Sequence, residues 1–173
     1  SELFDALTKS TSLRRLSLLR NELDADGVQS MVSFLRHSPH LAELSLSHNT
    51  INGGCLDMLL GALHESSTMK FLRFSYCNIE DISSLSTYTL PNLRTLNLQG
   101  NKIGKAGCII ISNLLRKSDT KLISLELSGM GDAEAVMLAN SLKHNTTLTS
   151  LRLLDSDTII DDVGCYAFLK LLI

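Results

Sequence analysis

The sequence predicts an α/β solenoid, a right-handed β-α superhelix whose short strands and helices stack along one axis. Three observations lead to this prediction. One pattern of apolar residues recurs six times, and its copies start 28, 28, 24, 29 and 26 residues apart. Leucine accounts for 35 of the 173 residues, while tryptophan is absent. A single side-chain shape repeated at a nearly fixed period is typical of stacked, similar units.

The apolar pattern defines the units. Each unit begins with an apolar residue, and further apolar residues follow at unit positions 4 and 6. The units start at Leu13, Leu41, Met69, Leu93, Leu122 and Leu148. We expect residues 1–173 to form one array of about six repeats. Residues 1–9 match the end of a preceding helix, and neither end carries the polar cap usual in such arrays, so we expect a segment of a longer protein.

Each unit predicts a strand followed by a helix. Positions 4 and 6 alternate with polar residues, so Leu16 and Leu18 face one side of a short strand. The stretches 27–35, 55–63 and 107–115 have the apolar spacing of a helix with one buried face. Neither element can bury its apolar face alone, so neighbouring units must stack. Because a helix is wider than a strand, we expect a curved molecule with a parallel sheet on its concave face and helices on its convex face.

Unit position 9 carries an amide or a thiol in four units. Asn21, Asn49, Cys77 and Asn101 stand at the point where the chain turns inward. We expect these side chains to hydrogen-bond the backbone of neighbouring coils, since a buried backbone needs partners.

Three units depart from the pattern. The third is the shortest, and after Ile79 it contains Pro91 and too few apolar residues for two helical turns, so a single turn is expected there. The fifth has Met130 and Asp132 in place of Asn and Leu, and the sixth carries extra residues at 155–162.

Units such as LAELSLSHNTI (41–51) and LRTLNLQGNKI (93–103), each followed by a small residue and a helical pattern, resemble leucine-rich repeats of the ribonuclease-inhibitor-like class. The repeat arrays of NOD-like receptors and of Ran GTPase-activating proteins are similar. The resemblance implies a non-enzymatic scaffold that binds a protein partner on its concave face. Two alternatives stay open: a GTPase-activating protein of the Ran type, and the ligand-sensing repeat region of a NOD-like receptor.

The sequence contains no motif of a catalytic or metal site. Gly-x-Ser-x-Gly, His-Glu-x-x-His and Cys-x-x-Cys are all absent. A net charge of −2 argues against nucleic-acid binding, and no apolar run reaches the ~20 residues of a membrane span. We therefore expect no cofactor, metal, nucleic acid or membrane contact. Cys108 and Cys165 each follow a glycine and are expected to be buried, and free thiols favour the cytoplasm, or alternatively the nucleus.

The residues between the leucines are the predicted binding surface. Positions 3, 5, 7 and 8 of each unit are expected to face outward on the concave side. The third unit places Phe71, Arg73 and Tyr76 there, and aromatic residues and arginine dominate protein–protein hot spots. In the alternative reading, Phe71 packs against its neighbours and Arg73 pairs with Glu43 or Glu126. The predicted partner-binding residues are Arg15, Arg20, His48, Phe71, Arg73, Tyr76, Asn97, Gln99, Glu126 and Arg152.

Overall fold

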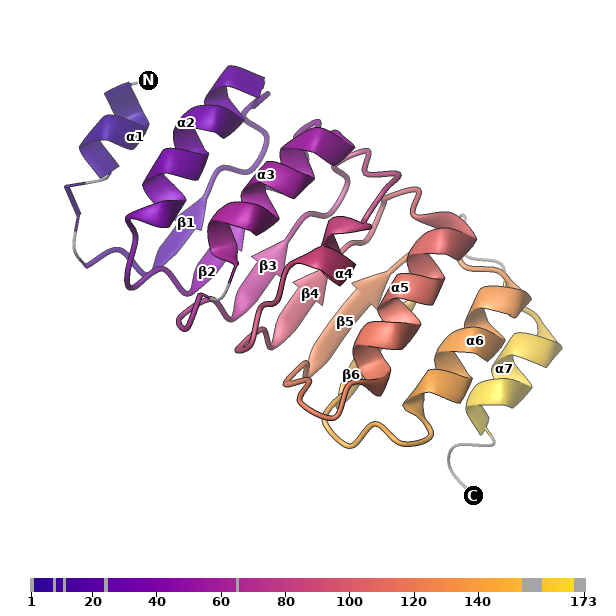
Figure 1. Cartoon of the computed structure of the whole chain (residues 1–173). Coiled ribbons are helices and arrows are strands. Elements are labelled where there is room, and N and C mark those ends of the chain that lie inside the picture. The colour runs from indigo at the N-terminus through magenta and orange to yellow at the C-terminus, as the bar shows by residue number, and fades with distance from the viewer. Residues whose placement is uncertain are drawn as a thin grey trace.

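Strands and helices alternate along the chain from one end to the other (Figure 1). The computed structural model describes residues 2–7, 9–10, 12–23, 25–64, 66–153 and 160–169. In this part of the chain the strands are β1 (Arg15–Ser17), β2 (Glu43–Ser45), β3 (Phe71–Arg73), β4 (Thr95–Asn97), β5 (Ser124–Leu127) and β6 (Ser150–Leu153). The helices are α1 (Glu2–Leu7), α2 (Ala25–Arg36), α3 (Gly53–Leu63), α4 (Ser84–Thr87), α5 (Gly104–Arg116), α6 (Asp132–Leu142) and α7 (Asp162–Leu169).

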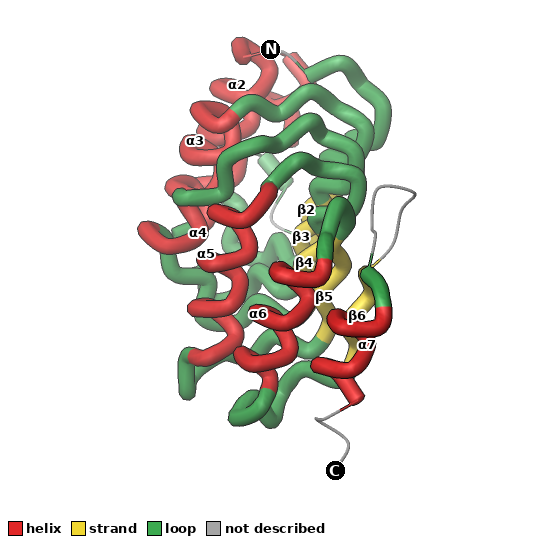
Figure 2. Tube along the Cα trace, turned by 90° about the vertical axis from the view of Figure 1, so that its right-hand side faces the viewer, coloured by secondary structure: helices red, strands yellow, loops and turns green. Residues whose placement is uncertain are grey.

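The strands form one open, parallel sheet in which every strand pairs with the next along the chain. Equal unit positions lie opposite one another, so Leu44 pairs with both Leu16 and Leu72. The helices lie on one face of the sheet and leave the other face uncovered (Figures 1 and 2). This arrangement confirms the predicted α/β solenoid.

The core lies between the sheet and the helices. The position 4 residues Leu44, Leu72, Leu96 and Leu125 are fully buried, because alternate strand side chains point toward the helices. Leu16 is only partly buried, because β1 is the edge strand of the described sheet. The leucines at position 4 therefore face inward, and positions 3 and 5 face the uncovered side.

Three of the four position 9 side chains, those of Asn49, Cys77 and Asn101, join neighbouring coils as predicted, whereas Asn21 Nδ2 donates to the Leu19 carbonyl of its own repeat. The Oδ1 atom of Asn101 accepts hydrogen bonds from the backbone N–H groups of Cys77 and Ile79, both at 3.0 Å. Its Nδ2 atom donates to the carbonyl oxygens of Phe74 at 2.6 Å and Leu98 at 2.8 Å.

Asn49 and Cys77 bond the preceding repeat in the same manner. Asn49 accepts from the backbone N–H groups of Asn21 and Leu23, at 3.0 and 3.1 Å. The Cys77 thiol donates to the carbonyl oxygen of Leu46 at 3.2 Å.

The departures from the repeat have structural counterparts. The third unit has a single turn, α4, where its neighbours α3 and α5 have 11 and 13 residues, and this confirms the predicted shortening. Met130 takes the place of the position 9 amide in the fifth unit and is buried. Most of the extra segment of the sixth unit (155–162), namely residues 155–159, lies outside the described residues.

One prediction about the cysteines is wrong. Cys108 is buried, as expected, but Cys165 is exposed. The two follow equivalent glycines, yet in α7 it is Gly164 that packs against the preceding helix: a Cβ there would lie 2.7 Å from the Asp132 carboxylate and 3.1 Å from the Ala135 side chain. Cys165 therefore lies outside the contact between α6 and α7.

Candidate interaction surface

The uncovered face of the sheet carries two rows of side chains. Because the strands pair in register, Arg15, Glu43 and Phe71 share the position 3 row. Arg73 and Asn97 lie opposite each other in the position 5 row, followed by Glu126 and Arg152. Short parallel strands thus bring residues about 28 positions apart in sequence into direct contact.

Glu43 is the centre of one charged cluster on this face. The Arg73 Nη1 atom donates a hydrogen bond to the Glu43 carboxylate, and the Arg15 Nε atom lies 3.8 Å from the second Glu43 oxygen. The Arg73 guanidinium also lies 5.9 Å from the centre of the Phe71 ring. Of the two alternatives for Arg73, the structure shows pairing with Glu43. Glu43 was not among the predicted site residues. The sequence feature that could have identified it is an acidic residue on the strand next to that of Arg73.

Glu126 is the centre of a second cluster. Its two carboxylate oxygens accept hydrogen bonds from Asn97 Nδ2 at 2.8 Å and from Arg152 Nη1 at 3.1 Å. Asn97 faces the uncovered side, as its strand position predicts, but its neighbours cover it and only 9% of the residue is exposed, so the expectation that it offers binding surface needs correction. Its Oδ1 atom accepts from the backbone N–H of Gln99 at 2.9 Å. Asn97 therefore holds its neighbours in place beneath the surface.

The residues just beyond the strands share an unusual backbone conformation. Position 8 has a positive φ in the first five units, at Arg20 (56°), His48 (60°), Tyr76 (54°), Gly100 (70°) and Gly129 (65°). Residues with a Cβ adopt this conformation with strain, whereas glycine does not. The leucine pattern does not predict this conformation, although the two glycines at the same unit position signal it.

Two aromatic rings stack at these positions. The ring centroids of His48 and Tyr76 lie 4.9 Å apart, with 18° between the ring planes. Gln99 Nε2 donates to the Tyr76 hydroxyl at 3.1 Å. A Cβ on Gly100 would lie 2.2 Å from the Tyr76 ring, so the absence of a side chain at Gly100 gives the ring its place.

Position 7 contributes less surface than expected. Ser47 and Ser128 are buried, and their hydroxyl oxygens accept hydrogen bonds from the backbone N–H groups of Ser75 at 3.1 Å and Gly100 at 2.6 Å. These serines serve the backbone turn, and only part of the position 7 row faces solvent.

The structure thus brings most of the predicted residues into three contacting groups. Arg15, Phe71 and Arg73 gather around Glu43; His48 and Tyr76 join Gln99; and Asn97 and Arg152 hold Glu126. Arg20 lies in the same row as His48, with its backbone N–H bonded to the Ser47 carbonyl. We call Phe71, Arg73, His48 and Tyr76 together the aromatic–arginine surface.

Two of the buried thiols, those of Cys77 and Cys108, are unreactive. Burial raises the pKa of the Cys77 thiol, and burial together with the Glu134 carboxylate raises the pKa of Cys108 to about 12. Both thiols stay protonated at neutral pH and are poor nucleophiles.

Among the described residues, no three His, Cys, Asp or Glu side chains lie close enough together to hold a metal ion. None of the described helices has the length and apolarity to cross a membrane.

Family models of the leucine-rich repeat match this chain at residues 9–32 and 37–58, and a model of two consecutive repeats matches residues 67–109. The chain is a leucine-rich-repeat protein. These matches cover strands β1 to β4, the helical turn α4 and the first parts of α2, α3 and α5. They confirm the resemblance found in the leucine pattern.

This leucine-rich-repeat protein is similar in sequence to proteins described as NACHT, LRR and PYD domains-containing. It is 29% identical to human protein 14 over 92% of this chain and 18% of the relative. It is 32% identical to mouse protein 14 over 90% of this chain and 16% of the relative, and 30% identical to human protein 12 over 84% and 14%. The chain spans less than a fifth of the length of these relatives.

Solved structures share the fold at lower identity. An internalin of Listeria monocytogenes superposes with a TM-score of 0.57 at 22% identity, covering 95% of this chain and 48% of that one. The actin-binding site 2 region of leiomodin-1 gives 0.54 at 15% identity, covering 99% and 86%. The tropomodulin C-terminal domain of Caenorhabditis elegans gives 0.51 at 14% identity, covering 99% and 89%.

Proposed function

We propose that this repeat array is a non-enzymatic scaffold that binds a protein partner on its concave face. The observation that carries the proposal is the aromatic–arginine surface. It combines Phe71, Arg73 and Tyr76, the residue types that dominate hot spots, on one strand and its exit. The helices occupy the opposite face of the sheet and leave this surface open (Figure 2).

The charges on this face point to the chemistry of the partner. Both carboxylates are already held by cations or amides, Glu43 by Arg15 and Arg73, and Glu126 by Asn97 and Arg152. Arg15 and Arg152 remain largely exposed, with 83% and 60% of their side chains accessible. A guanidinium has five N–H donors, so one ion pair leaves donors available. We infer that the partner presents carboxylates beside an apolar or aromatic group.

Replacing Arg73 and Tyr76 by alanine tests the proposal. Partners are first recovered with the intact array and identified by mass spectrometry, and each affinity is then measured with purified protein. We expect the double variant to bind at least tenfold more weakly, since hot-spot truncations typically exceed ~1.4 kcal/mol. The control is Arg36→Ala, an exposed arginine in the last turn of α2. Unchanged affinity of a folded double variant would contradict the proposal.

We propose further that the array is the ligand-sensing repeat region of a longer protein of the NOD-like receptor kind. The similarity to NACHT, LRR and PYD proteins over most of this chain supports this. Exposed apolar side chains on α7 support it as well: Val163, Tyr166 and Leu169 are 61%, 59% and 55% accessible, as expected where a further repeat packs. The unpaired cysteines support a cytoplasmic or nuclear location. A full reading frame that lacks a nucleotide-binding region would contradict the receptor assignment.

The non-enzymatic part of the proposal is tested by the reaction of the alternative family. In single-turnover GTP hydrolysis with purified small GTPases, we expect the array to leave the rate unchanged. Acceleration by the array would instead support the Ran-type activating function.

A further inference from the structure

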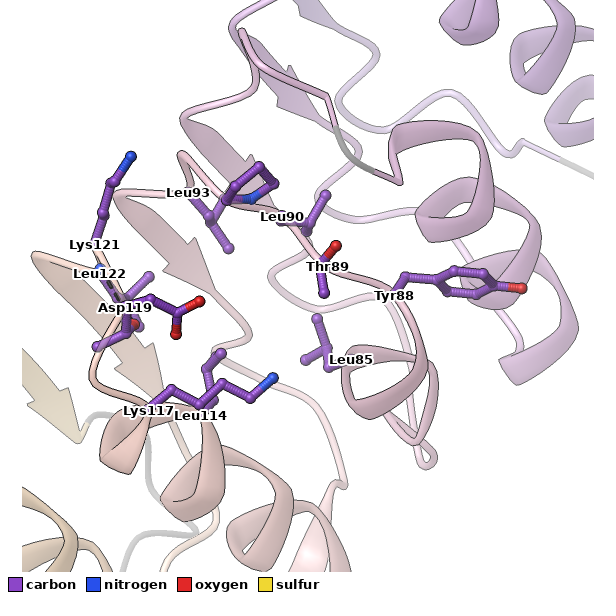
Figure 3. A pocket seen from close by; sticks show the side chains of 12 residues that line it. Leu85, Tyr88, Thr89, Leu90, Leu93, Leu114, Lys117, Asp119, Lys121 and Leu122 are labelled. Atoms are coloured by element: carbon purple, nitrogen blue, oxygen red, sulfur yellow. Dashed lines mark hydrogen bonds between the residues drawn. The ribbon is translucent and has the colours of Figure 1, made fainter.

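The short third repeat leaves a cleft on the helix side of the molecule. Between α3 and α5, which have 11 and 13 residues, the chain forms only the four-residue α4. The cleft has a volume of about 220 Å³ and lies between the segment after α4 and the end of α5 (Figure 3). Its apolar lining is Leu85, Leu90, Leu93, Leu114 and Leu122.

The contacts of the α4 segment place this cleft on the α5 side. The Tyr88 hydroxyl donates to Asp57 Oδ2 at 3.4 Å, and the Tyr88 ring lies 5.7 Å from the ring of His64. The Thr89 N–H donates to His64 Nδ1 at 3.2 Å. These bonds fasten the segment to α3, and Figure 3 shows Tyr88 pointing away from the other lining side chains.

The cleft has an apolar floor and a charged rim. Leu90 and Leu114 are half-buried and supply apolar surface that solvent reaches. At the rim, Lys117 and Lys121 are exposed, as is Asp119. Lys121 also donates to Asn92 Oδ1 at 2.8 Å. Two ammonium groups against one carboxylate give the rim a net positive charge.

We propose that this cleft binds a short helical segment of another protein that carries leucine-like side chains next to a carboxylate. The adjacent repeats each have a full helix where this repeat has a single turn, and an amphipathic helix lays its apolar face into such a groove. The volume is smaller than the ~300–1,000 Å³ typical of small-molecule pockets and suits one or two apolar side chains. The positive rim complements an acidic residue beside them. This second surface is separate from the concave face.

A synthetic helical peptide with two leucines four residues apart and two flanking glutamates is the probe. It is titrated into the 173-residue chain with ¹³C-labelled leucine methyl groups, observed by NMR. We expect saturable shifts of the Leu90 and Leu114 methyl signals. A peptide with both leucines replaced by alanine should bind at least about tenfold more weakly, since it buries far less apolar surface.

Charge variants of the chain separate this cleft from other sites. Lys117→Glu should weaken binding of the acidic peptide roughly fivefold, the upper range for an exposed ion pair. Lys105→Glu is the matched control, because it makes the same change at the start of the same helix, away from the cleft, and it should leave binding unchanged. Arg73→Ala should also leave it unchanged, so failure of the concave-face proposal does not affect this result.

Several outcomes would overturn the proposal. The first is equal binding of the alanine peptide, or shifts that leave Leu90 and Leu114 unaffected. If raising the protein concentration alone shifts these two methyl signals, a second copy of the chain occupies the cleft. If octanoate shifts them at lower concentration than the peptide does, the cleft is a small-acid site.

Discussion

A single amide holds two coils of the backbone together in the fourth repeat. Asn101 is 4% exposed and makes four hydrogen bonds of 2.6 to 3.0 Å with backbone groups of the third and fourth repeats. An amide offers both donor and acceptor, so it satisfies N–H and C=O groups that would otherwise be buried without partners.

Replacing Asn101 by alanine should lower the free energy of unfolding by about 3 kcal/mol, because buried backbone groups lose their partners. Asn21→Ala is the matched control: Asn21 holds the same unit position but is exposed, so its loss should stay below about 1 kcal/mol. Urea unfolding of the two variants measures both values. Equal losses would show that burial does not decide the role of this position.

A second residue-scale prediction concerns the glycines at position 8. Gly100→Ala and Gly129→Ala both place a Cβ at positive φ, which costs roughly 1 kcal/mol. Only at Gly100 does the new atom also collide with the Tyr76 ring; at Gly129 the nearest atom is 4.0 Å away. We expect Gly100→Ala to be the more destabilising in urea unfolding and to weaken partner binding. The prediction fails if the two variants behave alike.

The role of Asn101 is predictable from the sequence, whereas the backbone conformation of position 8 is not. The amide role follows from one residue type recurring at one position. Positive φ is signalled by glycine, yet three of the five described residues are Arg20, His48 and Tyr76. Their backbone N–H groups bond carbonyl oxygens of the following repeat, at Ser47, Ser75 and Gln99, and a single unit of sequence does not reveal these bonds.

At the scale of elements, the helices occupy the predicted stretches but begin earlier. Helices α2, α3 and α5 start at Ala25, Gly53 and Gly104, two or three residues before the apolar pattern. In α3 the start is set by Asn52, whose side chain accepts a hydrogen bond from the Cys55 N–H at 2.8 Å. Apolar spacing marks only the buried face of a helix, so it locates the helix better than its ends.

The Cys108 thiol, in helix α5, makes the free energy of unfolding depend on pH in the alkaline range. Its pKa rises from an ordinary 9.0 to about 12 on folding, so the folded protein keeps a proton that the unfolded chain loses. The contribution of this protonated thiol to the free energy of unfolding is complete below pH 9 and declines as the pH rises toward 12. We expect Cys108→Ala to be less stable at pH 8 but to lose less stability on going to about pH 10.5. Urea unfolding at both pH values measures these losses. If the variant and the unchanged protein lose the same stability between the two pH values, the prediction is contradicted.

At the scale of the whole molecule, the architecture follows from the repetition. Six copies of one pattern predict a parallel sheet in sequence order, because each unit buries its apolar face only against the next. The pairings on the concave face were less predictable. Arg73 bonds Glu43 diagonally across two strands, whereas Asn97 bonds Glu126, its direct neighbour in the register. Unit positions predict which residues share a row, but not which rotamers their side chains adopt.

The aromatic side chains allow a direct test of the proposal that a protein partner binds the concave face. Hydroxyl-radical footprinting of the array with and without its recovered partner reports the solvent access of each ring. Tyr76 lies on the aromatic–arginine surface and is 41% exposed, whereas Tyr166 lies on α7 and is 59% exposed. We predict that the partner protects Phe71, His48 and Tyr76 from oxidation and leaves Tyr166 unchanged. Protection of Tyr166 with undiminished oxidation of Tyr76 would place the partner elsewhere and contradict the account.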